Sequence, residues 1–354
     1  MRIRKLAPAL AAAALAMGAC SPGPSAAQQV QVQAAARTTG LDPAGLQAAL
    51  ADAAALPRLN SIIVARDGRV LAERSLDGRG LDQPVNIKSA SKSVLSALVG
   101  VAIGRGVLNG VDQPVLPLLA GRAPADPDLR LRELTVDHLL SMRAGLRSTS
   151  GANYGAWATS SDWVRAALAQ PMVDEPGGRM IYSTGTSHIL SAALTRAAGR
   201  STLELARDWL GEPLDISVPA WSRDPQGTYF GGNDMRLSPR ALLRFGELYR
   251  QNGVIDGRRV LPEGWVKRSW TPRGTSSWTG AGYGYGWWIG EARGHPIYYA
   301  WGYGGQMVYV VPDLGLTAVM TSDADGPREG GHIQALHAIV ADRLIPAAER
   351  GANA

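Results

Sequence analysis

The chain has 354 residues, a formal net charge of +6 and a single cysteine, Cys20. A lone cysteine excludes an intrachain disulfide and a cysteine-based zinc site. Three of the positive charges lie within the first five residues, and the basic residues that follow form no cluster. This distribution argues against nucleic-acid binding, and the histidines form no His-Glu-x-x-His motif that would indicate a metal.

The first predicted element is an export signal. Basic residues precede an apolar run from Leu6 to Met17, which is too short to span a bilayer as a permanent helix. Small residues then lead to Cys20, an arrangement similar to a bacterial lipoprotein signal, so we expect residues 1–20 to be a signal peptide and Cys20 to be lipidated. Cleavage within 25–27 is the alternative and would release a soluble protein. By the same resemblance, Ser21 after the cysteine favours the outer membrane.

The rest of the chain predicts a flexible tether and one large domain. Residues 21–40 are rich in Ala, Gln, Pro and Ser and poor in large apolar side chains, as is typical of a tether. We expect the domain to cover residues 41–346. Its sheet lobe would comprise about 41–88 and 283–346, and its helical lobe about 89–282.

Within the domain, strand patterns lie at both ends and helical patterns lie between them. The predicted strands cover 61–65, 70–75, 284–289, 297–301, 307–311 and 316–321. The predicted helices cover 41–55, a segment after residue 89, 135–142, 163–169, 187–198, 239–251 and 332–345. This order predicts an α/β (α+β) fold, in which an antiparallel sheet is flanked by terminal helices and interrupted by a mostly helical insertion.

A serine and a lysine at the start of the helical region carry the first chemical signal. Only four of the 36 basic residues are lysine, and one of them, Lys92, lies three residues after Ser89. Unlike arginine, a desolvated lysine can lose its proton near neutral pH. One helical turn would place the amine beside the hydroxyl, an arrangement typical of a serine nucleophile activated by an amine. Alternatively, Ser89 caps the helix and Lys92 is a solvated surface residue.

Three further motifs follow in a fixed order. They are LTVDHLLSMRAG at 134–145, Tyr182-Ser183-Thr184-Gly185, and WGYGGQ at 301–306. Together with Ser89-Ala-Ser-Lys92, they resemble the penicilloyl serine transferase superfamily, and most of all its class C β-lactamase-related serine hydrolases, which include esterases and 6-aminohexanoate-dimer hydrolases. The resemblance covers roughly residues 41–346 and implies an active site between a sheet and a helical lobe.

This resemblance assigns roles to particular residues. Ser89 would be the acylated nucleophile, and Lys92 would hold or relay its proton. Tyr182 would be a second proton-transfer group that protonates the leaving group; the alternative is a core tyrosine. The backbone N–H groups of Ser89 and Tyr303 would form the oxyanion hole. No metal and no organic cofactor is implied.

The substrate-binding elements depart from those of the antibiotic-binding members. Thr184 stands where the family usually has asparagine, and Ala300 stands where it has lysine or histidine before x-Gly. The cation that helps to hold a substrate carboxylate is therefore missing. The predicted substrate contacts are Thr184, Trp301, Gly302, Tyr154 and Trp157, and Trp221, Trp287 and Trp288 are further aromatic candidates. Core packing is the alternative for most of these aromatic residues.

The sequence as a whole predicts an exported serine hydrolase that acts through a Ser89 acyl-enzyme. Its expected substrates are small-molecule esters, with amides as a second class. The sequence indicates no nucleic-acid partner, and membrane contact only through the lipid on Cys20. One alternative is a β-lactamase or a D-Ala-D-Ala carboxypeptidase-like peptidase. Another is a catalytically inactive binding module of the cell envelope, against which the presence of Ser89, Lys92 and Tyr182 argues.

The lipoprotein assignment predicts where the protein is found. In a Gram-negative host, the wild type is expected in the membrane fraction, and Cys20→Ser should release it or stall its processing. Cell fractionation with N-terminal sequencing measures both effects. A wild type that is wholly soluble in the periplasm, with Gln28 or a neighbour as its mature N-terminus, would reject the lipidation of Cys20.

Overall fold

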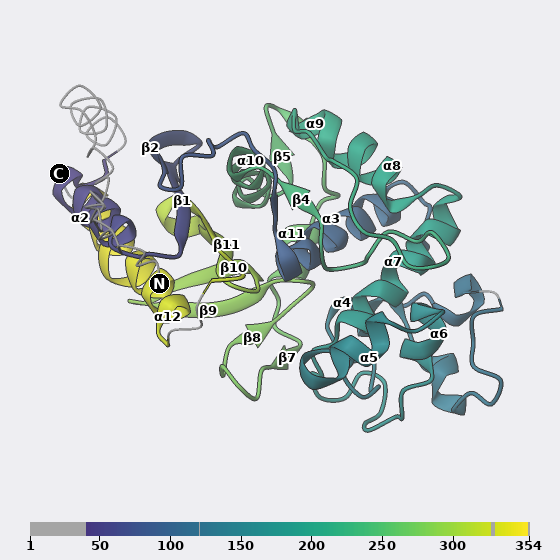
Figure 1. Ribbon diagram of the computed structural model, residues 1–354. Coiled ribbons are helices and arrows are strands. Elements are labelled where there is room, and N and C mark those ends of the chain that lie inside the picture. The colour runs from purple at the N-terminus through teal and green to yellow at the C-terminus, as the bar shows by residue number, and fades with distance from the viewer. Residues whose placement is uncertain (1–39, 120, 327–329, 353–354) are drawn as a thin grey trace, which may run out of the picture.

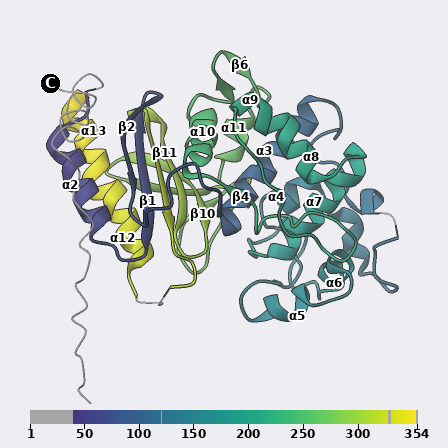
Figure 2. The same ribbon diagram turned by 45° about the horizontal axis from the view of Figure 1, so that its top comes forward.

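The computed structural model describes residues 40–119, 121–326 and 330–352. The predicted signal, the lipidated Cys20 and nearly all of the predicted tether lie outside these residues. Within them, no helix is both long enough and apolar enough to cross a membrane. A layer of terminal helices, a central sheet and a larger helical region follow one another across the molecule (Figure 1, Figure 2).

The sheet has eight strands in the order β2-β1-β12-β11-β10-β9-β8-β7, and all of its pairs are antiparallel. Its strands are β1 (Leu59–Arg66), β2 (Arg69–Ser75), β7 (Gly274–Thr275), β8 (Gly282–Tyr283), β9 (Trp288–Ala292), β10 (His295–Gly302), β11 (Gln306–Val311) and β12 (Leu316–Ser322). Because β1 pairs with β12, the two ends of the domain meet within the sheet, next to its β2 edge. The predicted mixed fold with an antiparallel sheet is confirmed.

The terminal helices cover one face of the sheet (Figure 2). They are α2 (Pro43–Ala54), which Asp42 caps, and the continuous run of α12 (His332–Ala338), the π-helical turn η7 (Ile339–Leu344) and α13 (Ile345–Ala352). Strand β1 shows why the sheet needs cover on both sides. Ile62 and Val64 belong to the apolar cluster under these helices, whereas Ile63 and Ala65 belong to the cluster on the opposite face.

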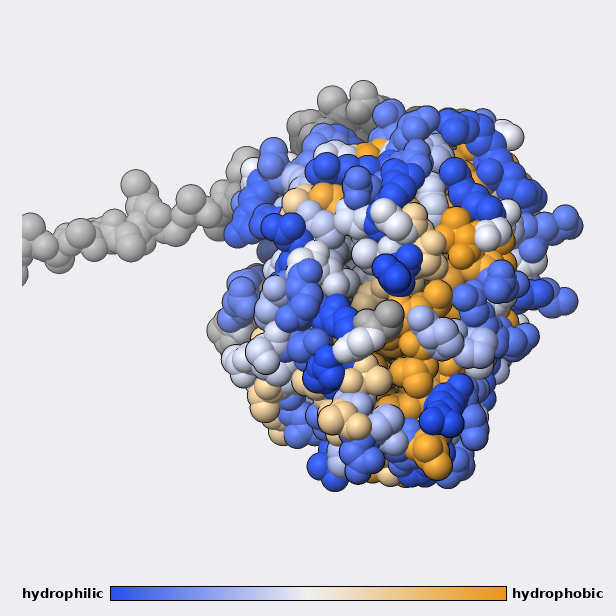
Figure 3. Space-filling view, turned by 90° about the vertical axis from the view of Figure 1, so that its right-hand side faces the viewer, coloured by the Kyte–Doolittle hydropathy of each residue, from blue (hydrophilic) through white to orange (hydrophobic). Residues whose placement is uncertain are grey.

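The helical region packs on that opposite face. Its helices are α3 (Ser91–Gly104), α4 (Val136–Leu140), α5 (Tyr154–Ala158), α6 (Trp163–Leu168), α7 (Thr184–Ala198), α8 (Thr202–Ala206), α9 (Glu212–Leu214), α10 (Pro239–Arg250) and α11 (Trp265–Ser269). Figure 3 shows its outer side, where hydrophilic residues surround a band of hydrophobic ones. Helix α3 is buried along nearly its whole length between this region and the sheet. It is therefore the element that the two sides of the molecule share.

Several predicted boundaries are wrong, for local reasons. The strand predicted at 284–289 starts only at Trp288, because the chain turns at Gly286 (φ +75°) and sends Tyr285 and Trp287 into the core. Helix α7 begins three residues earlier than predicted, and the last helix runs to Ala352.

The range predicted as a helical lobe also contains parts of the sheet layer. Strand β7 and the first residue of β8 join the sheet although they precede residue 283. Helix α10 packs directly on β11 and β12, where a Cβ at Gly246 would lie 2.7 Å from Thr317 and 2.9 Å from Val308. Very short strands and one glycine in an otherwise ordinary helix leave little trace in hydrophobic periodicity.

Candidate active site

Ser89 lies in a single helical turn, η1 (Lys88–Ala90), directly before α3. The first N–H groups of such a turn have no intrahelical acceptor, so they can stabilise negative charge. The preceding residue, Lys88, has a left-handed backbone with φ +49°. Its N–H donates to Asn86 Oδ1 over 2.9 Å. Strain of this kind costs on the order of 1–3 kcal/mol and is common where a reactive side chain must be aimed.

Two close backbone approaches bring the sheet to the serine. A Cβ at Gly302, at the end of β10, would lie 2.1 Å from the carbonyl oxygen of Ile87. A Cβ at Gly286 would lie 2.7 Å from the carbonyl oxygen of Lys92, and Ser93 Oγ donates to the Gly286 carbonyl over 2.5 Å. Only glycine permits this packing without displacement of the backbone. The β10–β11 turn that carries Tyr303 is thereby held against η1.

Lys92 is buried beside the serine. The residue is 3% exposed, and its Nζ is 3.1 Å from Ser89 Oγ and 2.7 Å from the Gly232 carbonyl oxygen. Burial lowers the pKa of Lys92 to about 7, because an ammonium loses its hydration there. The structure therefore brings together the two residues whose spacing the sequence singled out, with the amine near its neutral form at physiological pH.

A glycine turn holds the carbonyl that Lys92 contacts. Gly232 has φ +78°, and a Cβ there would lie 2.6 Å from Lys92 Cγ. The neighbouring Gly231 is fixed from both sides: its N–H donates to His188 Nδ1 over 3.2 Å, and its carbonyl accepts from Ser187 Oγ over 3.0 Å. Since His188 Nδ1 accepts, Nε2 carries the proton toward Asp224 Oδ2, 3.1 Å away. No role in the site was predicted for these residues, because the group that they hold is a backbone carbonyl, which leaves no side-chain signature.

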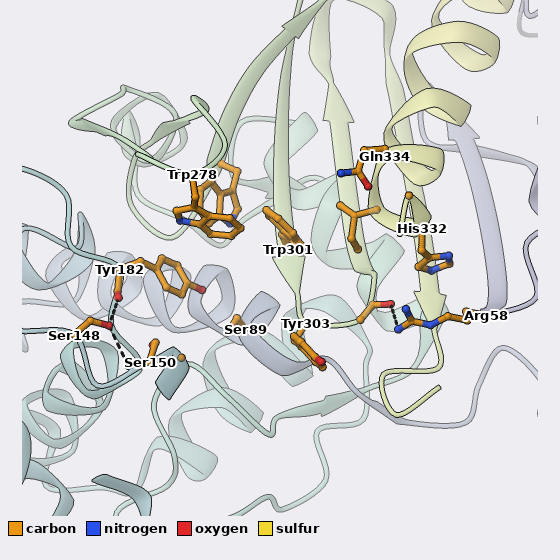
Figure 4. A pocket seen from close by; sticks show the side chains of 15 residues that line it. Arg58, Ser89, Ser148, Ser150, Tyr182, Trp278, Trp301, Tyr303, His332 and Gln334 are labelled. Atoms are coloured by element: carbon orange, nitrogen blue, oxygen red, sulfur yellow. Dashed lines mark hydrogen bonds between the residues drawn. The ribbon is translucent and has the colours of Figure 1, made fainter. Parts of the chain in front are cut away.

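Tyr182 completes the polar centre. It precedes α7, its ring lies 4.9 Å from Lys92 Nζ, and its hydroxyl end points toward Ser89 (Figure 4). Burial raises the pKa of Tyr182 to about 12, and a hydrogen bond with Ser89 only partly opposes this effect. The phenol therefore keeps its proton at neutral pH. The same ring stacks on Trp288, with centroids 5.6 Å apart, which fixes its orientation.

These groups open into a cleft of about 690 Å³. Its lining comprises Arg58, Ser89, Ser148, Ser150, Gly151, Tyr182, Trp278, Trp288, Trp301, Tyr303, Gly304, Gly331, His332, Ile333 and Gln334 (Figure 4). Ser89 and Tyr303, the predicted oxyanion residues, both belong to it, as does the predicted substrate contact Trp301. In the part of the chain that the structure describes, no group of three acidic, histidine or cysteine residues could hold a metal ion.

Other predicted substrate contacts lie outside the cleft. Trp157 is 3% exposed, donates its indole N–H to the Trp163 carbonyl and packs in an aromatic cluster, and Tyr154 packs on Phe230 in the same cluster. Gly302 is buried against Ile87. The structure thus corrects the placement of Trp157 from the cleft to the core, that of Tyr154 to a half-buried position packed against the core, and that of Gly302 to a packing position. Trp221 and Trp287 are buried as well.

Thr184 does not reach the cleft surface, because the side chain of Ser150 covers it. Its hydroxyl lies 3.0 Å from Ser150 Oγ, and its N–H donates to the same oxygen over 2.9 Å. Ser150, not Thr184, lines the cleft. The predicted hydrogen bond from Thr184 to a substrate would therefore have to pass through the Ser150 hydroxyl.

The sequence also missed two prominent lining residues. Trp278, in the β7–β8 connection, is 61% exposed. Its position within a run of Gly, Ser and Thr could have indicated an exposed side chain, because such a segment contains no apolar residues against which an indole can pack. Arg58 donates to the carbonyl of Asp323 over 2.8 Å and to that of Gly304 over 3.5 Å, beside Tyr303. The sequence contains no motif for this arginine, because its contact with Asp323 joins residues that lie 265 positions apart.

The sequence of this chain is similar to those of known proteins. Residues 51–342 match the Beta-lactamase family. A 6-aminohexanoate-dimer hydrolase of Paenarthrobacter ureafaciens is 26% identical over 264 residues, which cover 67% of this chain and 66% of that enzyme.

Solved structures show the same fold at lower identity. The chain superposes on EstCE1, described as a hydrolase with promiscuous acyltransferase activity, with a TM-score of 0.67, 18% identity and coverage of 90% and 100% of the two chains. For an octameric penicillin-binding protein homologue of Pyrococcus abyssi, the TM-score is 0.65, the identity 18% and the coverage 84% and 76%. With most of its length matched by the family, this chain belongs to the beta-lactamase family of serine hydrolases.

Proposed function

We propose that this protein hydrolyses small neutral esters, and amides more slowly, through an acyl-enzyme on Ser89. The observation that carries the proposal is the buried contact of 3.1 Å between Lys92 Nζ and Ser89 Oγ, with the Tyr182 hydroxyl also hydrogen-bonded to the serine. The relatives named as hydrolases support it. We further propose that the enzyme works in the cell envelope, anchored through Cys20.

Burial shifts the pKa values of the two proton-transfer groups in opposite directions. Burial lowers the pKa of Lys92 to about 7 and raises that of Tyr182 to about 12. Two titratable groups whose pKa values are pushed apart are suited to base and acid roles, respectively. We therefore assign Lys92 as the base that accepts the serine proton and Tyr182 as the acid that protonates the leaving group.

The proposed reaction follows from these positions. Ser89 Oγ bonds to the substrate carbonyl carbon while its proton passes to Lys92 Nζ. Negative charge develops on the carbonyl oxygen, which the N–H groups of Ser89 and Tyr303 would stabilise. The bond to the leaving oxygen then breaks, Tyr182 supplies that oxygen with a proton, and the Lys92 ammonium restores the proton of Tyr182. Water attacks the acyl-enzyme by the same route and releases the acid.

The cleft favours uncharged substrates. Ala300 is buried and offers no cation, and five tyrosine and tryptophan side chains line the cavity. Esters come before amides, because an alkoxide or phenoxide leaving group demands less proton donation than an amine.

Arg58 favours a second candidate, a β-lactamase or D-Ala-D-Ala carboxypeptidase-like activity. It lines the cleft near Gly304, and among the described residues it contacts carbonyl oxygens and no carboxylate. A guanidinium with this environment could bind a substrate carboxylate in place of the missing lysine.

Replacement of the nucleophile tests the core of the proposal. Ser89→Ala should abolish hydrolysis of every substrate and labelling by a fluorophosphonate or a fluorescent penicillin, while the protein stays folded, because the Ser89 side chain caps neither η1 nor α3. Labelling and turnover are measured beside Ser161→Ala, which alters an exposed serine outside the cleft. Activity above a few per cent of wild type would place the chemistry elsewhere, and an unlabelled wild type would indicate an inactive binding module.

The lysine predicts both a pH profile and a substitution effect. Since the neutral amine is the base, kcat/KM should rise with pH through about 7, the pKa that burial gives Lys92. Lys92→Arg should lower kcat by about 10²–10⁴-fold and remove that rise, because a guanidinium stays protonated. Lys267→Arg, at an exposed position on α11, is the matched control. An active Arg variant with an unchanged profile would reduce Lys92 to a structural residue.

Substrate selectivity separates the two candidate functions. A charge-assisted hydrogen bond to a carboxylate is worth about 1.5–3 kcal/mol, so its loss at Ala300 should penalise anionic substrates. We expect p-nitrophenyl acetate and butyrate to be cleaved, the 6-aminohexanoate dimer weakly or not at all, and cephalosporins poorly. The measurement is kcat/KM for p-nitrophenyl butyrate, the dimer and nitrocefin on one preparation. A higher value for nitrocefin that Arg58→Ala removes would favour the β-lactamase candidate.

A further inference from the structure

A second cavity adjoins the cleft. It has a volume of about 440 Å³ and lies between the β9–β10–β11 face of the sheet and the helical run of α12 and η7. It shares Trp278, Trp301, Ile333 and Gln334 with the cleft, so these four residues form the border between the two spaces. Figure 4 shows Trp278, Trp301 and Gln334 together along one side of the cleft.

The second cavity is built from apolar surface. Ile297, Tyr299 and Trp301 alternate along β10 and present one face to it. Tyr309 lies opposite Tyr299 on β11, and its hydroxyl is occupied by His337 Nδ1 at 3.1 Å.

The cavity contains little charge. Neither lysine nor arginine lines it, and Glu291, at an exposed position on β9, is its sole carboxylate among the described residues. Burial lowers the pKa of His337, which keeps the ring neutral. These surroundings suit an uncharged alkyl or aryl group and disfavour a carboxylate.

The position of the acid indicates which part of a substrate reaches this space. The leaving group must lie next to Tyr182, whose carbonyl accepts from Ser148 Oγ and whose ring stacks on Trp288. None of these three residues borders the second cavity. The acyl substituent and the leaving group of an ester diverge from the carbonyl carbon, so the acyl substituent extends away from Tyr182. Trp278 and Trp301 line both spaces and therefore lie between the carbonyl carbon and the second cavity.

We propose that the second cavity is the distal acyl-binding site, which receives an uncharged hydrophobic acyl chain that extends from Ser89 past Trp278 and Trp301. This proposal rests on the ester hydrolysis proposed above and narrows its substrate class to esters of medium-chain or aryl-substituted acids. Each methylene that leaves water for an apolar site contributes close to a fourfold gain, from about 0.8 kcal/mol per group.

Two substitutions fill the second cavity without touching the catalytic residues. Gly290 lines it from β9 with no positive φ, and the nearest atom to a Cβ there, Tyr299 Cε1, is 3.8 Å away. Gly290→Leu can therefore project into open space. Ala341→Phe fills the cavity from the opposite wall, at a half-buried position in η7. Gly155→Leu, on α5, is the matched control: it borders neither cavity and has nothing within 4 Å of a Cβ.

The experiment measures kcat/KM for p-nitrophenyl acetate, butyrate, octanoate and decanoate with the wild type and the three variants. For wild type and Gly155→Leu, octanoate should exceed butyrate by at least about tenfold, since several buried methylenes contribute. In Gly290→Leu and Ala341→Phe, this gain should fall severalfold or more, whereas acetate should be cleaved at the wild-type rate.

The outcomes distinguish the two proposals. If the wild type cleaves acetate but gains nothing from a longer acyl chain, or if both filling variants keep the gain, the distal acyl site is wrong and ester hydrolysis stands. If chain length matters only in the alcohol part, tested with alkyl acetates, the cavity binds the leaving group and the acyl assignment is overturned. If the wild type cleaves no ester, both proposals fall.

Discussion

The burial of one amine is the constraint on which the rest of the site depends. Lys92 can act as a base near neutral pH only if water and carboxylates stay away from it, since either would favour its charged form. Helix α3, which carries it, is accordingly enclosed between the sheet and the helical region. The two hydrogen-bonding groups that Nζ meets, Ser89 Oγ and the Gly232 carbonyl, are neutral. Burial of an amine without a carboxylate partner lowers the stability of the folded protein, and here the same burial makes Lys92 reactive.

Close backbone packing then fixes the geometry around that amine. Gly232, Gly286 and Gly302 each bring a main-chain segment to a distance at which no other residue fits. Through them, a loop of the helical region, the start of β9 and the end of β10 all contact the short segment that carries Ser89 and Lys92. The active site is thus formed where two layers meet, and it requires that neither layer shift by even the width of a methyl group.

The sequence could predict the reactive side chains but not their surroundings. Ser89 and Lys92 follow helical spacing, and the short apolar run of β11 between two turns is typical of a buried strand. The roles of Trp157 and Trp278 could not be separated, because an indole looks the same in sequence whether it packs in the core or stands 61% exposed at a cleft. The contact between the Gly232 carbonyl and Lys92 could not be predicted for another reason: the two residues lie 140 positions apart in the sequence.

Arg58 shows how one residue can combine a structural role with an influence on specificity. Its guanidinium joins the end of β12 to the β10–β11 turn by donating to the carbonyls of Asp323 and Gly304. If it swung toward a substrate carboxylate, it would loosen the turn that carries Tyr303, so any gain in anion binding would be offset by a poorer oxyanion hole. A cation on a separate strand position, as the family usually has at the place of Ala300, carries no such conflict. This difference favours neutral substrates even though the cleft contains an arginine.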